Sequence, residues 1–226
     1  MDNLRKYIKR LAAFFLIPLV QWHLRKKRYY TYRGTTVSIR PGVFHPGFFY
    51  STKFILCYLS ELKLSNKSLL ELGCGSGLIS IVSAKAGAQV TSTDLSSIAL
   101  TNTKENAILN GVKLVTIHSD LFDNINGIFD LIVVNPPYYA KDATNEPMLA
   151  WYCGKNFEYF QKFFKQLNNH INPTSQIIMV LTKGSDLSAI FKIAAKSGFS
   201  FELIQEKNVL FDEKDYLYRI ISSSFA

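Results

Sequence analysis

The amino-acid sequence predicts an α/β fold, in which helices cover both faces of a mostly parallel sheet. From residue 68 onward, apolar runs of strand length alternate with segments of helical spacing, which is the pattern of such a sheet. The last two apolar runs have only the acidic stretch Asp212–Asp215 between them, so they are expected to form a hairpin with one antiparallel strand. A hydrophobic fraction of 48% over 226 residues is enough for one domain with a full core.

The alternating patterns place each element in order. The expected strands are Ser68–Leu72, Gln89–Thr93, Lys113–His118, Phe129–Val134, Gln176–Leu181, Phe199–Gln205 and Tyr216–Ser222. The expected helices are Ser51–Leu62, Leu78–Ala86, Ser96–Asn110, Phe157–Leu167 and Leu187–Lys196. No internal repeat or second domain interrupts this order.

The positive charge of the chain is concentrated near its N-terminus. Residues 1–40 hold ten Lys and Arg residues and one acidic residue, whereas residues 41–226 hold sixteen of each. The apolar run Leu11–Val20 is too short for a transmembrane helix, which needs roughly 20 residues. We therefore expect a basic, partly helical extension over residues 1–40 and a catalytic domain over residues 41–226. The extension is expected to attach the protein to ribosomal RNA or to an anionic membrane surface, or else to pack on the domain.

The cysteines and histidines give no sign of a metal site or a disulfide framework. Cys57, Cys74 and Cys153 are odd in number and far apart, and the four histidines lack ligand spacing. We expect a protein without a metal cofactor in a reducing compartment, the cytoplasm. Peripheral attachment to the membrane is the alternative that the basic extension allows.

The glycine-rich segment Leu69–Gly77 ends the first predicted strand and opens the next helix. Glycines let the backbone turn sharply and approach a ligand, and ligands of open α/β sheets bind at the carboxyl ends of strands. The loop reads G-x-G-x-G at Gly73, Gly75 and Gly77, not the G-x-G-x-x-G of dinucleotide sites, and Glu71 precedes it. A carboxylate at this position repels a pyrophosphate but favours the positive amino and sulfonium groups of S-adenosylmethionine.

Two further acidic residues follow the second and third predicted strands. Asp94 can accept hydrogen bonds from both ribose hydroxyls, as the acid after the second strand does in dinucleotide folds. Asp120 can accept the exocyclic amine of adenine, with Leu121 or Phe122 against the ring. Either acid could instead cap a helix or lie in a turn. Acids at the ends of three successive strands favour the ligand-binding interpretation.

The tetrapeptide Asn135-Pro136-Pro137-Tyr138 follows the fourth predicted strand. Paired prolines also occur in purely structural turns. At the ligand-binding edge of the sheet, however, the Asn135 side-chain oxygen and the Pro136 carbonyl can each accept one N–H of an amide or ring amine. Pro137 stiffens the loop, and Tyr138 offers a ring on which a planar substrate can stack. Holding both hydrogens aims a weakly nucleophilic nitrogen at a methyl donor.

These motifs resemble those of the class I S-adenosylmethionine-dependent methyltransferases, and the resemblance covers residues 44–222. It implies a seven-stranded Rossmann-like sheet in the order 3-2-1-4-5-7-6, with strand 7 antiparallel. It also implies that S-adenosyl-L-methionine is the cofactor. The expected cofactor-binding residues are Glu71, Gly73, Gly75, Gly77, Asp94, Leu95, Asp120, Leu121 and Asn135.

The Asn135 tetrapeptide resembles the (Asn/Asp)-Pro-Pro-(Tyr/Phe) motif of methyltransferases that modify glutamine side chains, adenine N6 or guanine N2. The stretch Ala150–Phe157 also resembles a segment of the release-factor glutamine methyltransferases, with Cys153 and Phe157 in place of glycines. Trp151 and Tyr152 are the residues of this stretch that we expect at the substrate, together with Tyr138.

The sequence leaves three interpretations of function open. We favour an N-methyltransferase acting on a protein glutamine, with an adenine N6 or guanine N2 of rRNA, tRNA or DNA as the alternative. A non-catalytic module that binds S-adenosylmethionine is an alternative of another class. The Asn135 loop speaks against a dinucleotide oxidoreductase, because a hydride donor has no use for two amine acceptors.

Overall fold

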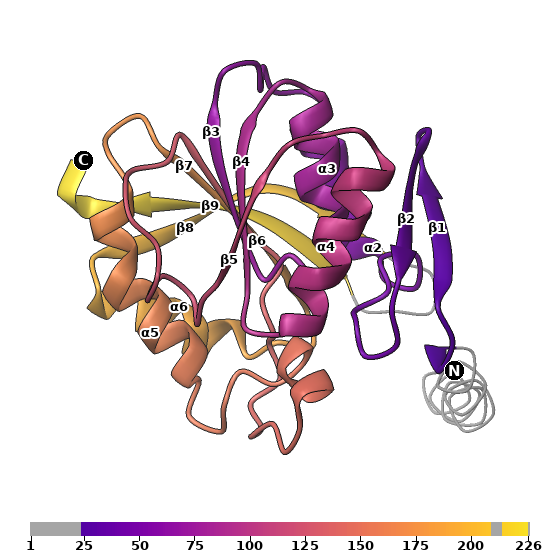
Figure 1. Ribbon diagram of the computed structural model, residues 1–226. Coiled ribbons are helices and arrows are strands. Elements are labelled where there is room, and N and C mark those ends of the chain that lie inside the picture. The colour runs from indigo at the N-terminus through magenta and orange to yellow at the C-terminus, as the bar shows by residue number, and fades with distance from the viewer. Residues whose placement is uncertain (1–23, 209–213, 226) are drawn as a thin grey trace.

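The computed structural model describes residues 24–208 and 214–225 and contains a central seven-stranded sheet (Figure 1). Its strands lie in the order β5-β4-β3-β6-β7-β9-β8. Numbered along the chain from β3, this is the expected order 3-2-1-4-5-7-6, and β9 runs antiparallel to both of its neighbours. The strands are β3 (Ser68–Leu72), β4 (Gln89–Asp94), β5 (Val115–His118), β6 (Leu131–Val134), β7 (Gln176–Thr182), β8 (Phe199–Lys207) and β9 (Asp215–Ser222).

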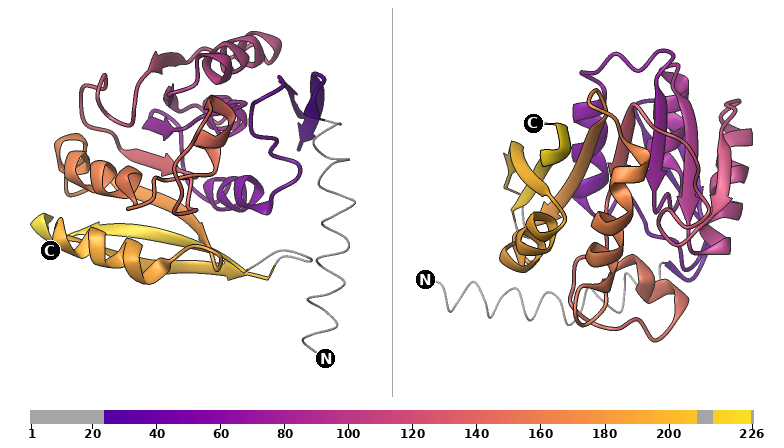
Figure 2. Two further views of the ribbon diagram at one scale, coloured as in Figure 1. Left: turned by 90° about the horizontal axis from the view of Figure 1, so that it is seen from below. Right: turned by 90° about the vertical axis from the view of Figure 1, so that its left-hand side faces the viewer.

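Helices cover both faces of this sheet, as the sequence predicted (Figures 1 and 2). One face carries α2 (Tyr50–Leu59), α3 (Leu78–Lys85) and α4 (Ser97–Leu109), and the other carries α5 (Glu158–Leu167) and α6 (Leu187–Lys196). Short 3₁₀ helices lie at η1 (Glu146–Ala150), η2 (Asn168–His170) and η3 (Ser223–Phe225). No helix within 24–208 and 214–225 is long and apolar enough to cross a membrane.

The buried face of α5 shows why these segments become helices. Phe160, Phe163, Phe164 and Leu167 recur at helical spacing and are each at most 1% exposed, so one stripe of the helix fills the core beneath the sheet. The three phenylalanines of α5 therefore belong to the core and not to the cavity wall.

Residues 28–39, at the end of the expected, partly helical extension, form a β-hairpin of β1 (Arg28–Tyr32) and β2 (Thr35–Ile39), which was not among the expected elements. Arg33 and Gly34, between the strands, both have positive φ, +44° and +80°, as a tight two-residue hairpin turn requires. Alternating tyrosine and β-branched residues favour strands on either side of this turn. The apolar run Leu11–Val20 lies outside the described residues.

Candidate functional site

A cavity of about 480 Å³ opens at the carboxyl ends of the central strands, between the glycine loop and the segment that follows β6. Its walls contain almost all of the site residues that the sequence indicated. These are Glu71, Gly73, Gly75, Asp94, Leu95, Asp120, Leu121, Asn135, Pro136, Pro137, Tyr138, Trp151 and Tyr152.

Gly77 is the one expected cofactor residue that does not line the cavity. It has a φ of +74°, and a Cβ atom placed on it would lie 2.7 Å from Cγ2 of Thr103 on α4. Gly77 is therefore required for the close approach of the loop to α4, and a cofactor contact by its backbone stays a prediction.

The backbone of the glycine loop is held against β4. The amides of Gly73 and Cys74 both donate to the carbonyl of Thr93, at 2.9 and 2.8 Å. Gly73 has a φ of +73°, and an added Cβ would meet no protein atom within 4 Å, so its backbone faces open space. At Gly73 the loop thus presents backbone without a side chain to the cavity.

Glu71 lies at the base of the cavity and is only 4% exposed. Its Oε2 accepts a hydrogen bond from the Ser80 amide at 2.9 Å and a second, short one from the Ser80 hydroxyl. Burial, with a smaller contribution from the nearby Asp94, raises the pKa of the Glu71 carboxyl to about 8 in spite of the hydrogen bonds from Ser80. A positive group bound beside Glu71 would stabilise the ionised carboxylate and so lower its pKa.

Asp94, at the end of β4, is held by two backbone donors. Its Oδ2 accepts from the Gly75 amide and its Oδ1 from the Ser96 amide, both at 2.9 Å. Burial raises the pKa of the Asp94 carboxyl in spite of these bonds. Because each carboxylate oxygen can accept a second hydrogen bond, the structural role of Asp94 and a role in ligand binding are compatible.

Asp120 and Leu121 follow β5. The carboxylate of Asp120 forms an ion pair with Lys162 of α5 at 2.6 Å, and Lys162 also reaches Asp123 at 2.7 Å. Leu121 is buried with a φ of +54°, so a strained backbone turns its side chain into the wall of the cavity. The charge of Asp120 is thus partly balanced within the protein, which the sequence did not indicate.

Asn135 stands directly after β6, with its side chain turned towards the N-terminal end of α2. Its amide nitrogen donates to the Ser51 hydroxyl at 3.2 Å. In this orientation the amide oxygen has no partner among the described residues and is available to accept an N–H. Pro136 is buried and Pro137 half-buried, so both prolines are embedded in the wall beside it.

The segment after Tyr138 folds back along itself. The Tyr139 amide donates to the Trp151 carbonyl and the Cys153 amide donates to the Tyr139 carbonyl, both at 3.0 Å. The Trp151 ring lies against Phe44 and Phe49, with ring centroids 5.4 and 4.8 Å away. These contacts bring the Trp151 stretch and the segment ahead of α2 together above the cavity.

Phe157 stands where the release-factor glutamine methyltransferases have a glycine, and the backbone conformation at this position favours glycine. Its φ is +62°, in the left-handed region, immediately ahead of α5. The side chain packs against the core beside α5, which offsets this strain. Cys153, the other glycine replacement, does not have a positive φ, and its thiol is buried.

Several residues of the site carry no recognisable signal in the sequence. Ser80 holds Glu71, Lys162 pairs with Asp120, and Tyr159 lines the cavity with its pKa raised by burial. Each comes from a helix face and reaches its partner only through the tertiary fold.

The antiparallel last strand and the acids set around a glycine loop are features that define the class I S-adenosylmethionine-dependent methyltransferases. Within that class, the chain belongs to the methyltransferase small domain family, whose model matches residues 34–206. The protein is accordingly an S-adenosylmethionine-dependent methyltransferase.

Two relatives and one solved structure illustrate this similarity. A candidate protein N5-glutamine methyltransferase of Methanocaldococcus jannaschii is 31% identical over 186 residues, which cover 80% of this chain and 92% of the relative. The release factor glutamine methyltransferase of Lactococcus lactis is 34% identical over 148 residues, covering 59% of this chain and 55% of the relative. The T. thermophilus 16S rRNA N2 G1207 methyltransferase, solved with AdoMet and guanosine, has the same fold, with a TM-score of 0.64 at 19% identity over 85% of this chain and 49% of that one.

The cavity fits S-adenosylmethionine, the methyl donor of this class. Its volume is in the range of small-molecule sites, from about 300 to 1,000 Å³. The remaining acceptor capacity of Asp94 suits a pair of ribose hydroxyls, and the buried Glu71 suits a cationic amino group. The open backbone at Gly73 leaves room for the ligand between these two acids.

Proposed function

We propose that this protein methylates the side-chain amide nitrogen of a glutamine in a protein substrate. The observation that carries the proposal is the environment of Asn135, a residue of the cavity wall whose amide nitrogen donates to Ser51 and whose amide oxygen has no hydrogen-bond partner among the described residues. Together with the carbonyl of Pro136, this oxygen offers two acceptors to a nitrogen that bears two hydrogens. The names of the two relatives with 31% and 34% identity support glutamine as the acceptor.

The chemistry required of these residues is positioning. S-adenosylmethionine supplies the methyl group on a positive sulfonium. An amide nitrogen is a weak nucleophile because its lone pair is delocalised into the carbonyl. Asn135 and Pro136 would hold both N–H bonds and turn the nitrogen towards the methyl group, and their acceptors stabilise the positive charge that develops on nitrogen. The proton can leave after transfer, so no strong base is needed.

The charge of the domain favours a protein over a nucleic acid. Residues 41–226 carry sixteen basic and sixteen acidic residues, so the domain lacks the excess of positive charge typical of phosphate-backbone binding. The alternative is an exocyclic amine of RNA, which the ten basic residues of segment 1–40 favour.

Labelled methyl transfer separates the two acceptors. The purified protein and methyl-labelled S-adenosylmethionine are added to an extract of cells lacking the protein, which is then treated with protease or with nuclease. We expect protease alone to release the label from the macromolecular fraction. Label that survives protease and is released by nuclease would establish the RNA alternative.

A further inference from the structure

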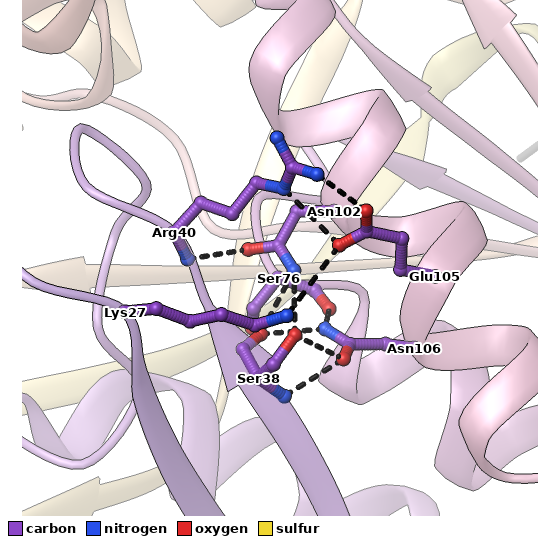
Figure 3. A network of polar contacts seen from close by, with 7 residues as sticks. All are labelled: Lys27, Ser38, Arg40, Ser76, Asn102, Glu105 and Asn106. Atoms are coloured by element: carbon purple, nitrogen blue, oxygen red, sulfur yellow. Dashed lines mark hydrogen bonds and ion pairs between the residues drawn. The ribbon is translucent and has the colours of Figure 1, made fainter.

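Three asparagines form a ladder along strand β2: Asn102 and Asn106 of α4, and Asn110, which caps the C-terminal end of that helix. Asn106 Oδ1 accepts from the Ser38 amide at 2.7 Å, and its Nδ2 donates to the Ser38 carbonyl at 2.7 Å (Figure 3). Asn102 Oδ1 accepts from the Arg40 amide at 2.9 Å, and its Nδ2 donates to the Ser38 carbonyl at 2.9 Å. Asn102 and Asn106 are fully buried.

The ladder rests on a match between two periodicities. Four helical residues rise about 6 Å, and two strand residues rise about 6.6 Å. Asparagines spaced by four therefore meet every second residue of β2, and Asn110 continues the series by donating to the Thr36 carbonyl at 2.7 Å. The edge of β2 that does not pair with β1 is thereby satisfied by side-chain amides. A two-stranded hairpin needs such support, because alone it is at best marginally stable.

The same face of α4 also holds the cofactor loop. Asn106 Nδ2 donates to the Ser76 carbonyl at 2.9 Å in addition to its bond to β2. The Thr103 hydroxyl donates to the Gly75 carbonyl at 3.1 Å. Asn106 is thus shared between the hairpin and the loop, whereas Asn110 has bonds to Thr36, to Lys85 and within its own helix but none to the loop.

The chain that leaves β2 runs over the cavity. Gly42, Val43, Phe44 and Pro46 line it, and an added Cβ on Gly75 would lie 3.9 Å from Cβ of Phe44. The guanidinium of Arg40 donates to both carboxylate oxygens of Glu105, and this fixes the start of segment 40–46. Phe44 then packs on Trp151, so residues 40–46 connect the ladder to the acceptor side of the cavity.

We propose that Asn106, assisted by Asn102, is a positioning residue that couples the β1–β2 hairpin to the cofactor loop. Residues 28–46 act as a strap over the cofactor. Binding of S-adenosylmethionine and docking of the strap stabilise each other through the shared asparagine. This inference rests on the cofactor and not on the identity of the methyl acceptor.

Amide hydrogen exchange in the wild-type protein tests the coupling directly. The amides of Ser38 and Arg40 are the donors to Asn106 and Asn102, so their exchange reports whether the ladder is closed. We expect saturating S-adenosylmethionine, added without any acceptor, to slow the exchange of both amides about three- to tenfold. Unchanged exchange at both amides, with cofactor binding confirmed by calorimetry, would overturn the proposal.

Two matched substitutions provide the reciprocal measurement. We expect Asn106→Ala to weaken S-adenosylmethionine binding about three- to tenfold, because linkage requires the same factor in both directions. Asn110→Ala removes a bond to the same strand but none to the loop, and we expect it to change cofactor affinity less than about twofold. Equal losses in the two variants would contradict the coupling. If Asn106→Ala does not fold, the proposal is tested by the hydrogen exchange of the wild-type protein with and without S-adenosylmethionine.

A wrong acceptor assignment leaves both measurements unchanged, since neither contains an acceptor. Conversely, the protein could methylate glutamine while the exchange of the Ser38 and Arg40 amides is unchanged by the cofactor. That result would refute the proposed coupling and leave the proposed function intact.

Discussion

The two halves of the cavity are built in different ways. On the cofactor side, Glu71 and Asp94 are fixed by hydrogen bonds to backbone amides of the glycine loop, α3 and the start of α4. On the acceptor side, the Trp151 stretch is held by strand-like backbone bonds and by ring contacts with the segment ahead of α2. The cofactor side is therefore part of the sheet framework, whereas the acceptor side can vary with loop sequence. Substitutions should separate these two halves cleanly.

The largest effect is expected on the acceptor side. Asn135→Ala removes one of the two acceptors for the substrate nitrogen, and we expect the turnover rate to fall about 10²- to 10³-fold. S-adenosylmethionine affinity should change little, since the acceptor acts mainly as nitrogen becomes positive. Steady-state kinetics with calorimetry of cofactor binding measures both. Turnover equal to wild type would reduce Asn135 to a turn residue.

The next effect is expected on the cofactor side. Asp94→Ala removes a charged acceptor and should weaken S-adenosylmethionine binding by about 1.5–3 kcal/mol, or about 10- to 150-fold. Because Asp94 also holds the Gly75 amide, Asp94→Asn serves as the control that retains the shape of the side chain. An unchanged dissociation constant in Asp94→Ala would remove this residue from the cofactor site.

The raised pKa of Glu71 predicts a pH dependence of cofactor binding. Below pH 8 the Glu71 carboxyl of the free protein is mostly protonated, and a cationic ligand favours its ionised form. Affinity should therefore rise with pH, by up to about tenfold per unit between pH 6 and 7.5, and level off above pH 8. Glu71→Gln should lose this slope. Calorimetry from pH 6 to above pH 8 measures the S-adenosylmethionine affinity of the wild type and of Glu71→Gln. A wild-type affinity that does not change with pH would contradict contact between Glu71 and the cationic ligand.

The smallest effect is expected at the aromatic contacts above the cavity. Trp151→Ala removes the ring that packs on Phe44 and Phe49, and we expect the KM for the acceptor to rise about three- to tenfold. Trp151→Phe, which keeps a ring, should restore most of the loss. Cofactor affinity should stay within about twofold of wild type. A larger loss of cofactor affinity than of acceptor affinity would show that the two halves are not separable.

The sequence predicted well those features that are encoded locally. The positions of the strands and helices and of the glycine loop follow from spacing along short segments, whereas the strand order was implied by the resemblance to the class I methyltransferases. It could not show that Gly77 packs on Thr103, because that contact joins segments that are separated along the chain.

The same limit applies to pairs of charged or polar residues. Lys162 lies 42 residues after its partner Asp120, and Asn106 lies 68 residues after Ser38, so no local pattern relates them. The β1–β2 hairpin was missed for another reason: the expectation for residues 1–40 rested on their charge and on the apolar run Leu11–Val20, and the alternation within the two short strands was not used. Gly34, which lies between these two segments, is the local feature that a turn-based interpretation of the sequence would have used.

The central claim is that the Asn135 loop presents a nitrogen bearing two hydrogens to the methyl donor. Its most direct test is the identity of the methylated atom. The labelled product of the wild-type protein is digested and the modified residue is identified by mass spectrometry and comparison with synthetic standards. We predict a methyl group on the side-chain amide nitrogen of glutamine, formed about 10²- to 10³-fold more slowly in a parallel reaction with Asn135→Ala of equal cofactor occupancy. A methyl group on oxygen, sulfur or carbon would contradict the account.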